Sequence, residues 1–174
     1  MISTKSELLQ YLNQDAKANK HTGIRARLFG DEIWKYIKSF RYVDYFSHQR
    51  STFSRFCYRV WSMRFHVLGI KLGFSISNCA EIGPGFAIAH YGSIVIHSSA
   101  VIGKNFRIHE GTCIGTTNGS NSAAKIGDNV FISTGAKIIG DISIANDVAI
   151  GANAVVVKSI DEPGTTWGGY LRVN

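Results

Sequence analysis

The chain has 174 residues, 45% of them hydrophobic, and a net charge of +7, which is typical of a soluble globular protein with one domain or one domain and a small cap. No run of about 18 apolar residues and no apolar signal core occurs, so neither a spanning helix nor a signal peptide is predicted and the cytoplasm is favoured. Residues 1–74 carry thirteen Lys and Arg against five Asp and Glu, whereas residues 75–174 carry six against seven.

The basic N-terminal part predicts an acidic partner, because a positive surface attracts anions. An acidic glycan, nucleotide phosphates and anionic lipid all fit this charge. No nucleic-acid-binding motif occurs, so nucleic acid is not expected as a partner. Peripheral contact with the inner face of the membrane is therefore one hypothesis for this region.

Residues 1–74 are predicted to form a helical cap. Thr4 and Glu7 have the spacing of a capping box and precede an apolar helical segment. Asp31 is the expected N-cap of a second helix.

A third helix is predicted from about Ser51 to Leu68, because apolar residues recur there at helical spacing: Phe53, Phe56, Cys57, Val60 and Trp61. Arg55 and Arg59 lie on another face of this helix. They are either ordinary surface residues or a basic patch for an acidic ligand, and the sequence leaves both open.

From residue 75 onward an isoleucine or valine returns every six residues. A six-residue period fits neither a helix nor simple strand alternation, but it is typical of a parallel β-helix in which each coil uses three hexapeptides. An earlier set of four is offset from the rest by two residues, which predicts a bulged coil. The positions are Ile76, Ile82, Ile88, Ile94, then Ile96, Ile102, Ile108, Ile114, Ile126, Ile132, Ile138, Ile144, Ile150 and Val156.

The predicted organisation is a cap over 1–74, a β-helix over 75–162 and a tail over 163–174. Residues 115–125 lack interior aliphatic residues and predict a loop that projects from one corner. A prism of stacked coils has flat faces, so we expect a homotrimer with functional clefts between neighbouring prisms.

Three histidines, His90, His97 and His109, lie in the repeats near positions that usually hold small residues. A bulky ionisable side chain at a corner is a candidate for chemistry. Each of them taken alone could also be an ordinary exposed residue.

The motif order of the repeats resembles the serine acetyltransferase family, and more closely the short acetyltransferases of capsule and exopolysaccharide synthesis, of the colanic-acid type. The resemblance covers about residues 76–174 and rests on three segments: EIGPGFAIAHYGSIVI, AVIGKNFRIHEGTCIG and KIGDNVFISTGAKIIGDISIANDVAIGANAVVVKSI. It implies a left-handed β-helix, assembly as trimers or dimers of trimers, and transfer of acetyl from acetyl-CoA to a hydroxyl.

The resemblance also assigns roles to residues. His90 matches the catalytic histidine, which as a neutral imidazole takes the acceptor proton in a direct transfer within a ternary complex. Gly115 matches a glycine close to the thioester. The implied contacts of acetyl-CoA are Ser133, Gly135, Ala136, Gly151 and Ala152 for the pantetheine arm, and Lys158 and Arg172 for the phosphates. No metal is expected.

The departures from the family pattern concern the acceptor. Ser75 and Ala89 stand where the family has aspartates near the histidine, and Ser122 and Ala123 stand where an arginine–histidine pair holds the serine carboxylate. The sequence therefore favours a hydroxyl of a capsular or exopolysaccharide sugar as acceptor, with L-serine as the alternative.

One coil after the catalytic histidine, His109 and Glu110 are candidate helpers or acceptor ligands. Three other hypotheses remain open. They are a zinc carbonic anhydrase of the γ type that uses the three repeat histidines, a covalent mechanism through Cys113 or Cys79, and a silent trimeric scaffold. The cysteines form no metal or disulfide pattern, and we expect buried free thiols.

Overall fold

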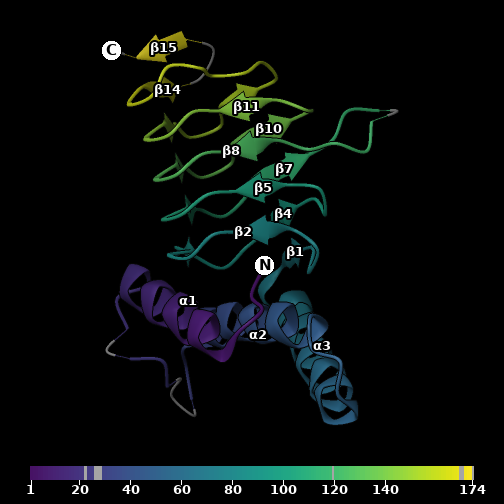
Figure 1. Cartoon of the computed structure of the whole chain (residues 1–174). Coiled ribbons are helices and arrows are strands. Elements are labelled where there is room, and N and C mark those ends of the chain that lie inside the picture. The colour runs from purple at the N-terminus through teal and green to yellow at the C-terminus, as the bar shows by residue number, and fades with distance from the viewer. Residues whose placement is uncertain (22, 26–28, 119, 169–170, 174) are drawn as a thin grey trace.

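A computed structural model describes residues 1–174 except 22, 26–28, 119, 169–170 and 174. Three helices lie at one end of a tall stack of short parallel strands (Figure 1). The stack is the predicted parallel β-helix of close to five coils, and the chain climbs it from the helices towards the C-terminus. The fold is therefore mainly β with an N-terminal helical region, as the six-residue period predicts.

The first helix begins as the sequence predicts. In α1 (Lys5–Ala18), the Thr4 hydroxyl accepts from the Glu7 N–H at 3.2 Å, and the Glu7 carboxylate accepts from the Thr4 N–H at 2.9 Å. Asp31 is the N-cap residue of α2 (Glu32–Ser47), as predicted, but its backbone is left-handed and its side chain makes no capping hydrogen bond.

The third helix is longer than predicted. α3 (Thr52–Leu72) begins after Ser51, whose hydroxyl accepts from the Ser54 N–H at 3.0 Å, and ends at Gly73 with φ of 76°. Its inner side packs on α2, where Trp61 stacks on Tyr42 with ring centroids 4.2 Å apart.

Each of the first four coils contributes one short strand to each of three parallel sheets. The fifth coil adds a strand to the first and third sheets and a single bridge at Ile160 to the second, and the last strand is antiparallel. The first sheet contains β1 (Phe74–Ile76), β4 (Ile94–Ile96), β7 (Cys113–Gly115), β10 (Lys137–Ile139) and β13 (Val155–Val156). The second contains β2 (Glu81–Ile82), β5 (Val101–Ile102), β8 (Lys125–Ile126) and β11 (Ser143–Ile144). The third contains β3 (Ala87–Ile88), β6 (Arg107–Ile108), β9 (Phe131–Ile132), β12 (Ala149–Ile150), β14 (Thr166–Gly168) and β15 (Leu171–Val173).

The interior of the prism is a set of stacked aliphatic side chains. Ile96 is level with Ile114, and Ile114 with Ile138, and all three are buried. The two extra residues that shift the period lie between β3 and β4, at residues 89–93. This longer corner carries His90, so the bulge that the sequence predicts coincides with the candidate catalytic residue.

Two segments leave the regular coils. The connection between β7 and β8 leaves the prism, and Figure 1 shows its described parts, residues 116–118 and 120–124, extending away from the coils. The predicted tail is more ordered than expected, because β14 pairs with β12 and β15 turns back on β14. The third sheet therefore continues beyond the last hexapeptide.

A buried ion pair joins the cap to the first coil. The Arg41 Nε of α2 donates to the Asp15 carboxylate of α1 at 2.7 Å, and both side chains are at most 1% exposed. Arg41 also donates to the carbonyls of Ile82 and Gly83, at 2.6 and 2.7 Å. The junction fixes α1 against the turn between β2 and β3, where Gly85 and Phe86 donate to the Asp15 carboxylate.

Candidate functional site

One corner of the prism, at the carboxyl ends of β3, β6, β9 and β12, holds most of the predicted site residues. The register pairs Ile88 with Ile108, and its continuation places His90 level with Glu110. The Ala89 N–H donates to the Ile108 carbonyl at 3.1 Å, so the strand pairing extends into the corner. The period of the coils thus stacks residues that are about twenty positions apart in the sequence.

His90, His109 and Glu110 form a compact cluster at this corner. One donor atom from each residue, a ring nitrogen or a carboxylate oxygen, lies within 4.8 Å of the donor atoms of the other two. The two imidazole rings meet edge to face with centroids 5.6 Å apart, and His109 also meets Phe131 edge to face at 5.2 Å. The structure therefore brings together the candidate base and both of its candidate helpers.

Glu110 supplies negative charge to the cluster. Its pKa lies below the ordinary value, because its own backbone N–H donates to the carboxylate, and His90 and His109 add a smaller favourable electrostatic effect. The Glu110 Oε2 atom is buried, has no hydrogen-bond partner among the described residues, and lies 3.9 Å from the His109 Nδ1. This oxygen is therefore available to accept a hydrogen bond from a protonated His109 or from a ligand.

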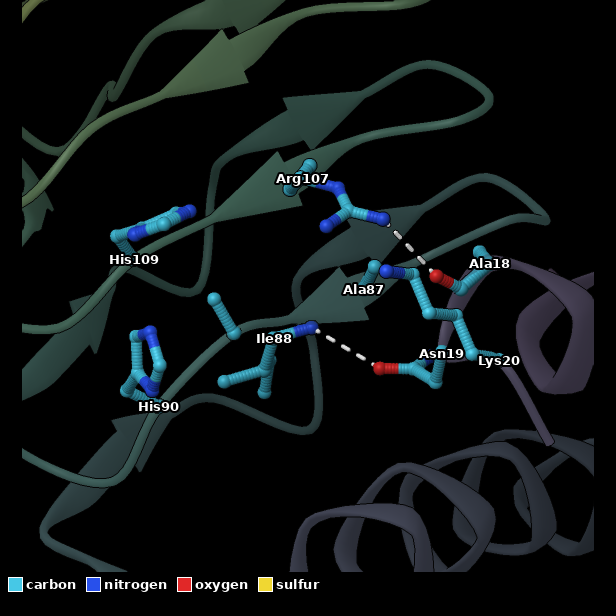
Figure 2. Close-up of a pocket in the computed structure, with 9 residues that line it drawn as sticks. Ala18, Asn19, Lys20, Ala87, Ile88, His90, Arg107 and His109 are labelled. Atoms are coloured by element: carbon cyan, nitrogen blue, oxygen red, sulfur yellow. Dashed lines mark hydrogen bonds between the residues drawn. The ribbon is translucent and has the colours of Figure 1, made fainter.

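A pocket of about 300 Å³ opens beside the cluster, between the end of α1 and the third sheet. Figure 2 shows the His90 and His109 rings on one side of it and the Lys20 and Arg107 side chains on the other. Arg107 donates to the Ala18 carbonyl at 3.0 Å, which ties this side of the pocket to the helix. The pocket therefore combines a candidate base with two permanent cations.

The cap side of the pocket was not predicted from the sequence. The Asn19 side chain caps α1, donates to the Phe86 carbonyl at 2.8 Å and accepts from the Ile88 N–H at 3.3 Å. Lys20 follows with a left-handed φ of 60°, a conformation that a residue with a Cβ adopts rarely. These contacts join residues almost seventy positions apart, so a local sequence pattern cannot predict them.

The residues that depart from the family pattern lie as follows. Ser75 is exposed on β1. Ala89, which replaces one of the family's aspartates, lies level with His109 of the next coil. The His109 imidazole is therefore the neighbour of the position that the aspartate occupies in the family. Ser122 is exposed and Ala123 is buried, and neither lines the His90 pocket. The pocket's cations come instead from the turn after α1, which carries Lys20, and from β6, which carries Arg107.

The predicted contacts of acetyl-CoA are distributed over several faces. Ser133, Gly135, Gly151 and Ala152 lie along the same corner as His90, one and two coils beyond Glu110. Ala136 is fully buried and its N–H and carbonyl both bond within the prism, which argues against a contact with a ligand.

The other donor-site residues lie away from this corner. Gly115 ends β7 and does not line the His90 pocket. Lys158 is exposed after β13, and the Arg172 side chain lies outside the described residues. Sequence reasoning missed Lys137, whose ammonium donates to the carbonyls of Gly111 and Gly135 and braces two successive turns of the corner.

The three repeat histidines do not gather. His97 follows β4 of another sheet, where its Nδ1 is 2.9 Å from the Ser99 hydroxyl, so a single chain does not bring the three histidines together. A zinc site shared across a subunit interface stays a prediction. His90, His109 and Glu110 offer donor atoms that a metal ion accepts. The expected burial of the three thiols is wrong, because Cys79 is exposed and Cys57 and Cys113 are half-buried. Neither Cys79 nor Cys113 lines the His90 pocket.

Residues 123–158 match the family model described as "Bacterial transferase hexapeptide (six repeats)". The chain is also 39% identical over 98 residues to a serine acetyltransferase of Staphylococcus aureus strain Mu50, covering 55% of this chain and 46% of that protein. The chain thus spans about half the length of the curated relatives it matches.

The solved structures with a similar fold include soybean serine acetyltransferase complexed with serine, with a TM-score of 0.76 and 25% identity, covering 97% of this chain and 70% of that one. A serine acetyltransferase in complex with CoA has a TM-score of 0.76 and 22% identity over the same shares. These relatives support the predicted likeness to serine acetyltransferases. The closer likeness to colanic-acid-type enzymes stays a prediction.

Proposed function

We propose that this protein is an acetyl-CoA-dependent O-acetyltransferase with His90 as its general base. The observation that carries the proposal is the pocket in which His90 and His109 face Lys20 and Arg107. A neutral imidazole accepts the proton of an acceptor hydroxyl, and the lysine and arginine hold an anionic group on the same acceptor.

The proposed step is a direct transfer. The acceptor oxygen attacks the thioester carbonyl carbon while its proton moves to His90, and the carbon–sulfur bond then breaks. The CoA sulfur leaves with the proton from the imidazolium, which restores the base. Glu110, with its lowered pKa, is the negative charge that stabilises the imidazolium between the two events. It takes the part that the resemblance gives to an aspartate.

The donor site is proposed to be completed by a neighbouring copy. Gly115 lies on another face from His90, so a single chain does not bring the two together. A trimer of prisms would place the Gly115 face of one copy beside the His90 corner of the next. The groove then contains Ser133 and Gly151 as contacts of the pantetheine arm.

L-Serine is the acceptor that the serine acetyltransferase relatives favour. Lys20 and Arg107 can bind the carboxylate of L-serine, which Ser122 and Ala123 cannot do. The missing arginine–histidine pair therefore argues less strongly against L-serine than the sequence alone suggests. A sugar hydroxyl next to an acidic group is the second candidate, because the clamp residues of the family are absent and the pocket still favours an anion.

The test is CoA thiol release from acetyl-CoA with L-serine, an acidic sugar and a neutral sugar as acceptors. His90→Ala is expected to lower kcat about 100- to 10,000-fold. The matched control, His97→Ala, removes a half-buried repeat histidine on another face and is expected to leave kcat unchanged. Equal losses in the two variants would contradict the role of His90.

The acceptor is then identified by Lys20→Ala. The variant is expected to raise the KM of the anionic acceptor at least about tenfold, since one charge-assisted contact is lost. Lys104→Ala, at an exposed turn of the same prism, is the control. Turnover of a neutral sugar ahead of both anionic acceptors would overturn the proposed role of the two cations.

A further inference from the structure

The outer side of α3 is an apolar stripe that none of the described residues covers. Six residues on this side are between 49% and 72% exposed, although all are large and apolar. Isolated exposed apolar side chains are ordinary, but a continuous set on one element marks an interaction surface. The stripe consists of Phe53, Phe56, Val60, Met63, Val67 and Ile70.

The stripe runs along the whole helix. Its members alternate in steps of three and four residues, so they lie on one side of a helix whose stripe is about 26 Å long at 1.5 Å per residue. The opposite part of the helix is already used: Trp61 stacks on α2, and Phe65 stacks on Tyr36 at 4.6 Å. Packing against the protein therefore leaves the stripe unpartnered, and Figure 1 shows α3 extending away from the prism.

The charged residues beside the stripe indicate which kind of partner would cover it. α3 contains no Asp or Glu, and at 100° per residue Arg55 and Arg59 fall along one border of the stripe and Arg64 along the other. Among the described residues no acidic side chain pairs with these arginines, whereas Lys71 has Glu32 at 3.9 Å. A second copy of α3 would bring arginines against arginines, so the charge pattern disfavours self-pairing.

A basic pocket adjoins the stripe at the N-terminal end of α3. It measures about 380 Å³ and is lined by Arg55, Arg59 and Tyr58 together with Gln49 and Ser47. Guanidinium groups suit phosphate oxygens because they donate several hydrogen bonds in one plane. An apolar stripe bordered by arginines and an open arginine pocket is the arrangement of a helix that lies in a membrane interface.

We propose that α3 docks this protein on an anionic lipid surface, with the stripe in the acyl boundary and Arg55 and Arg59 on the headgroup phosphates. The binding is peripheral, since no helix in the described part of the chain is long and apolar enough to cross a bilayer. The inference does not depend on the chemistry at His90.

The test is co-sedimentation of the full chain with vesicles of phosphatidylcholine alone or mixed with phosphatidylglycerol, at low and high salt. The wild type is expected to bind the mixed vesicles, and binding is expected to weaken with salt. Phe56→Gln/Met63→Gln is expected to lower partitioning at least about tenfold. The control, Val157→Gln, changes an equally exposed apolar residue on the prism and is expected to have no effect.

The charge contribution is tested separately. Arg55→Gln/Arg59→Gln is expected to lower binding to the mixed vesicles about 25-fold, at about fivefold for each cation near an anionic surface. Lys5→Gln/Lys17→Gln removes the same charge from exposed positions of α1 and is the control.

Three results would overturn the proposal. One is no preference of the wild type for anionic vesicles, and another is an equal loss in the α3 variants and their controls. The third is a Phe56→Gln/Met63→Gln protein with unchanged vesicle binding and a smaller sedimentation coefficient, which would make a second copy the occupant of the stripe. Thiol release with acetyl-CoA in the absence of vesicles reports on His90 independently.

Discussion

The first coil of the prism is held from above and from below in two different ways. Above it, the Gly83 and Ala87 N–H groups donate to the carbonyls of Ile102 and Phe106 in the next coil, as at every later level. Below it there is no coil, and the helical cap supplies the hydrogen-bond partners instead. The Asp15 carboxylate accepts from the N–H groups of Gly85 and Phe86, at 2.8 and 2.9 Å.

This contrast shows how a solenoid ends. A stack of coils leaves backbone donors and acceptors exposed at each end, and unpaired strand edges promote association. At the N-terminal end, one ion pair between Asp15 and Arg41 satisfies two N–H groups and two carbonyls of the first coil. The hydrogen bonds between coils are numerous and each stabilises the fold a little, whereas at the junction two side chains make all of these contacts.

The largest expected effect is at the junction. Arg41→Ala leaves the buried Asp15 carboxylate without its cation, so the free energy of unfolding is expected to fall by about 3–5 kcal/mol. Urea unfolding followed by circular dichroism measures it. Asp15→Ala/Arg41→Met, which removes both charges, is expected to cost less than the two single changes together. Additive losses would mean that the two side chains do not act as a pair.

A core change in the prism tests the repeated contacts. Ile132 is fully buried in β9, and Ile132→Ala is expected to lower the free energy of unfolding by about 2–5 kcal/mol through lost burial and a cavity. The control is Val157→Ala at an exposed position, expected to cost about 0.5 kcal/mol or less. Similar urea midpoints for the two variants would show that the aliphatic stack contributes little.

A smaller effect is expected at the turns between coils. Asn129 has φ of 58°, accepts from the Asn105 amide and donates to the Asp147 carboxylate, both at 2.8 Å. Asn129→Ala is expected to lower the free energy of unfolding by about 1–2 kcal/mol, because alanine adopts the left-handed region poorly. Asn129→Gly keeps the backbone without strain and is expected to cost less in the same urea titration. If Asn129→Gly cost more than Asn129→Ala, the loss of stability would come from the side-chain hydrogen bonds to Asn105 and Asp147 and not from backbone strain.

The smallest change in the free energy of unfolding at neutral pH is expected for a substitution of Tyr36, which packs between α3 and β1. Burial raises the pKa of the Tyr36 hydroxyl well above 10, against a weaker opposing hydrogen bond to the backbone of Ile76. The neutral phenol is favoured in the folded state, so its stabilisation is complete below about pH 10 and is lost as the pH rises above that value.

Tyr36→Phe is expected to cost about 1 kcal/mol at pH 7, through the lost hydrogen bond, and to flatten the loss of stability above pH 10. Urea unfolding over pH 7–11 measures both changes. Tyr11 and Tyr42 also have raised pKa values because of burial, so part of the alkaline loss is expected to remain. Parallel pH curves for wild type and variant would contradict the role of Tyr36.

The sequence by itself determined the prism, because a period of six residues places every aliphatic side chain in the same interior column. It also placed His90 on an irregular corner, since the shift of the period marks where the chain is longer. With three hexapeptides per coil, the step of about twenty residues that brings Glu110 over His90 is already present in the pattern.

Only the tertiary structure decided what faces that corner and what covers the cap. Asn19 and Lys20 reach the pocket because the Asp15–Arg41 pair docks α1 on the first coil, a contact between residues far apart in sequence. Likewise, Phe53, Phe56 and Trp61 fit one helical pattern, yet only Trp61 packs on α2. A helical period shows which residues are apolar, but the neighbour that packs against the helix decides which of them are buried.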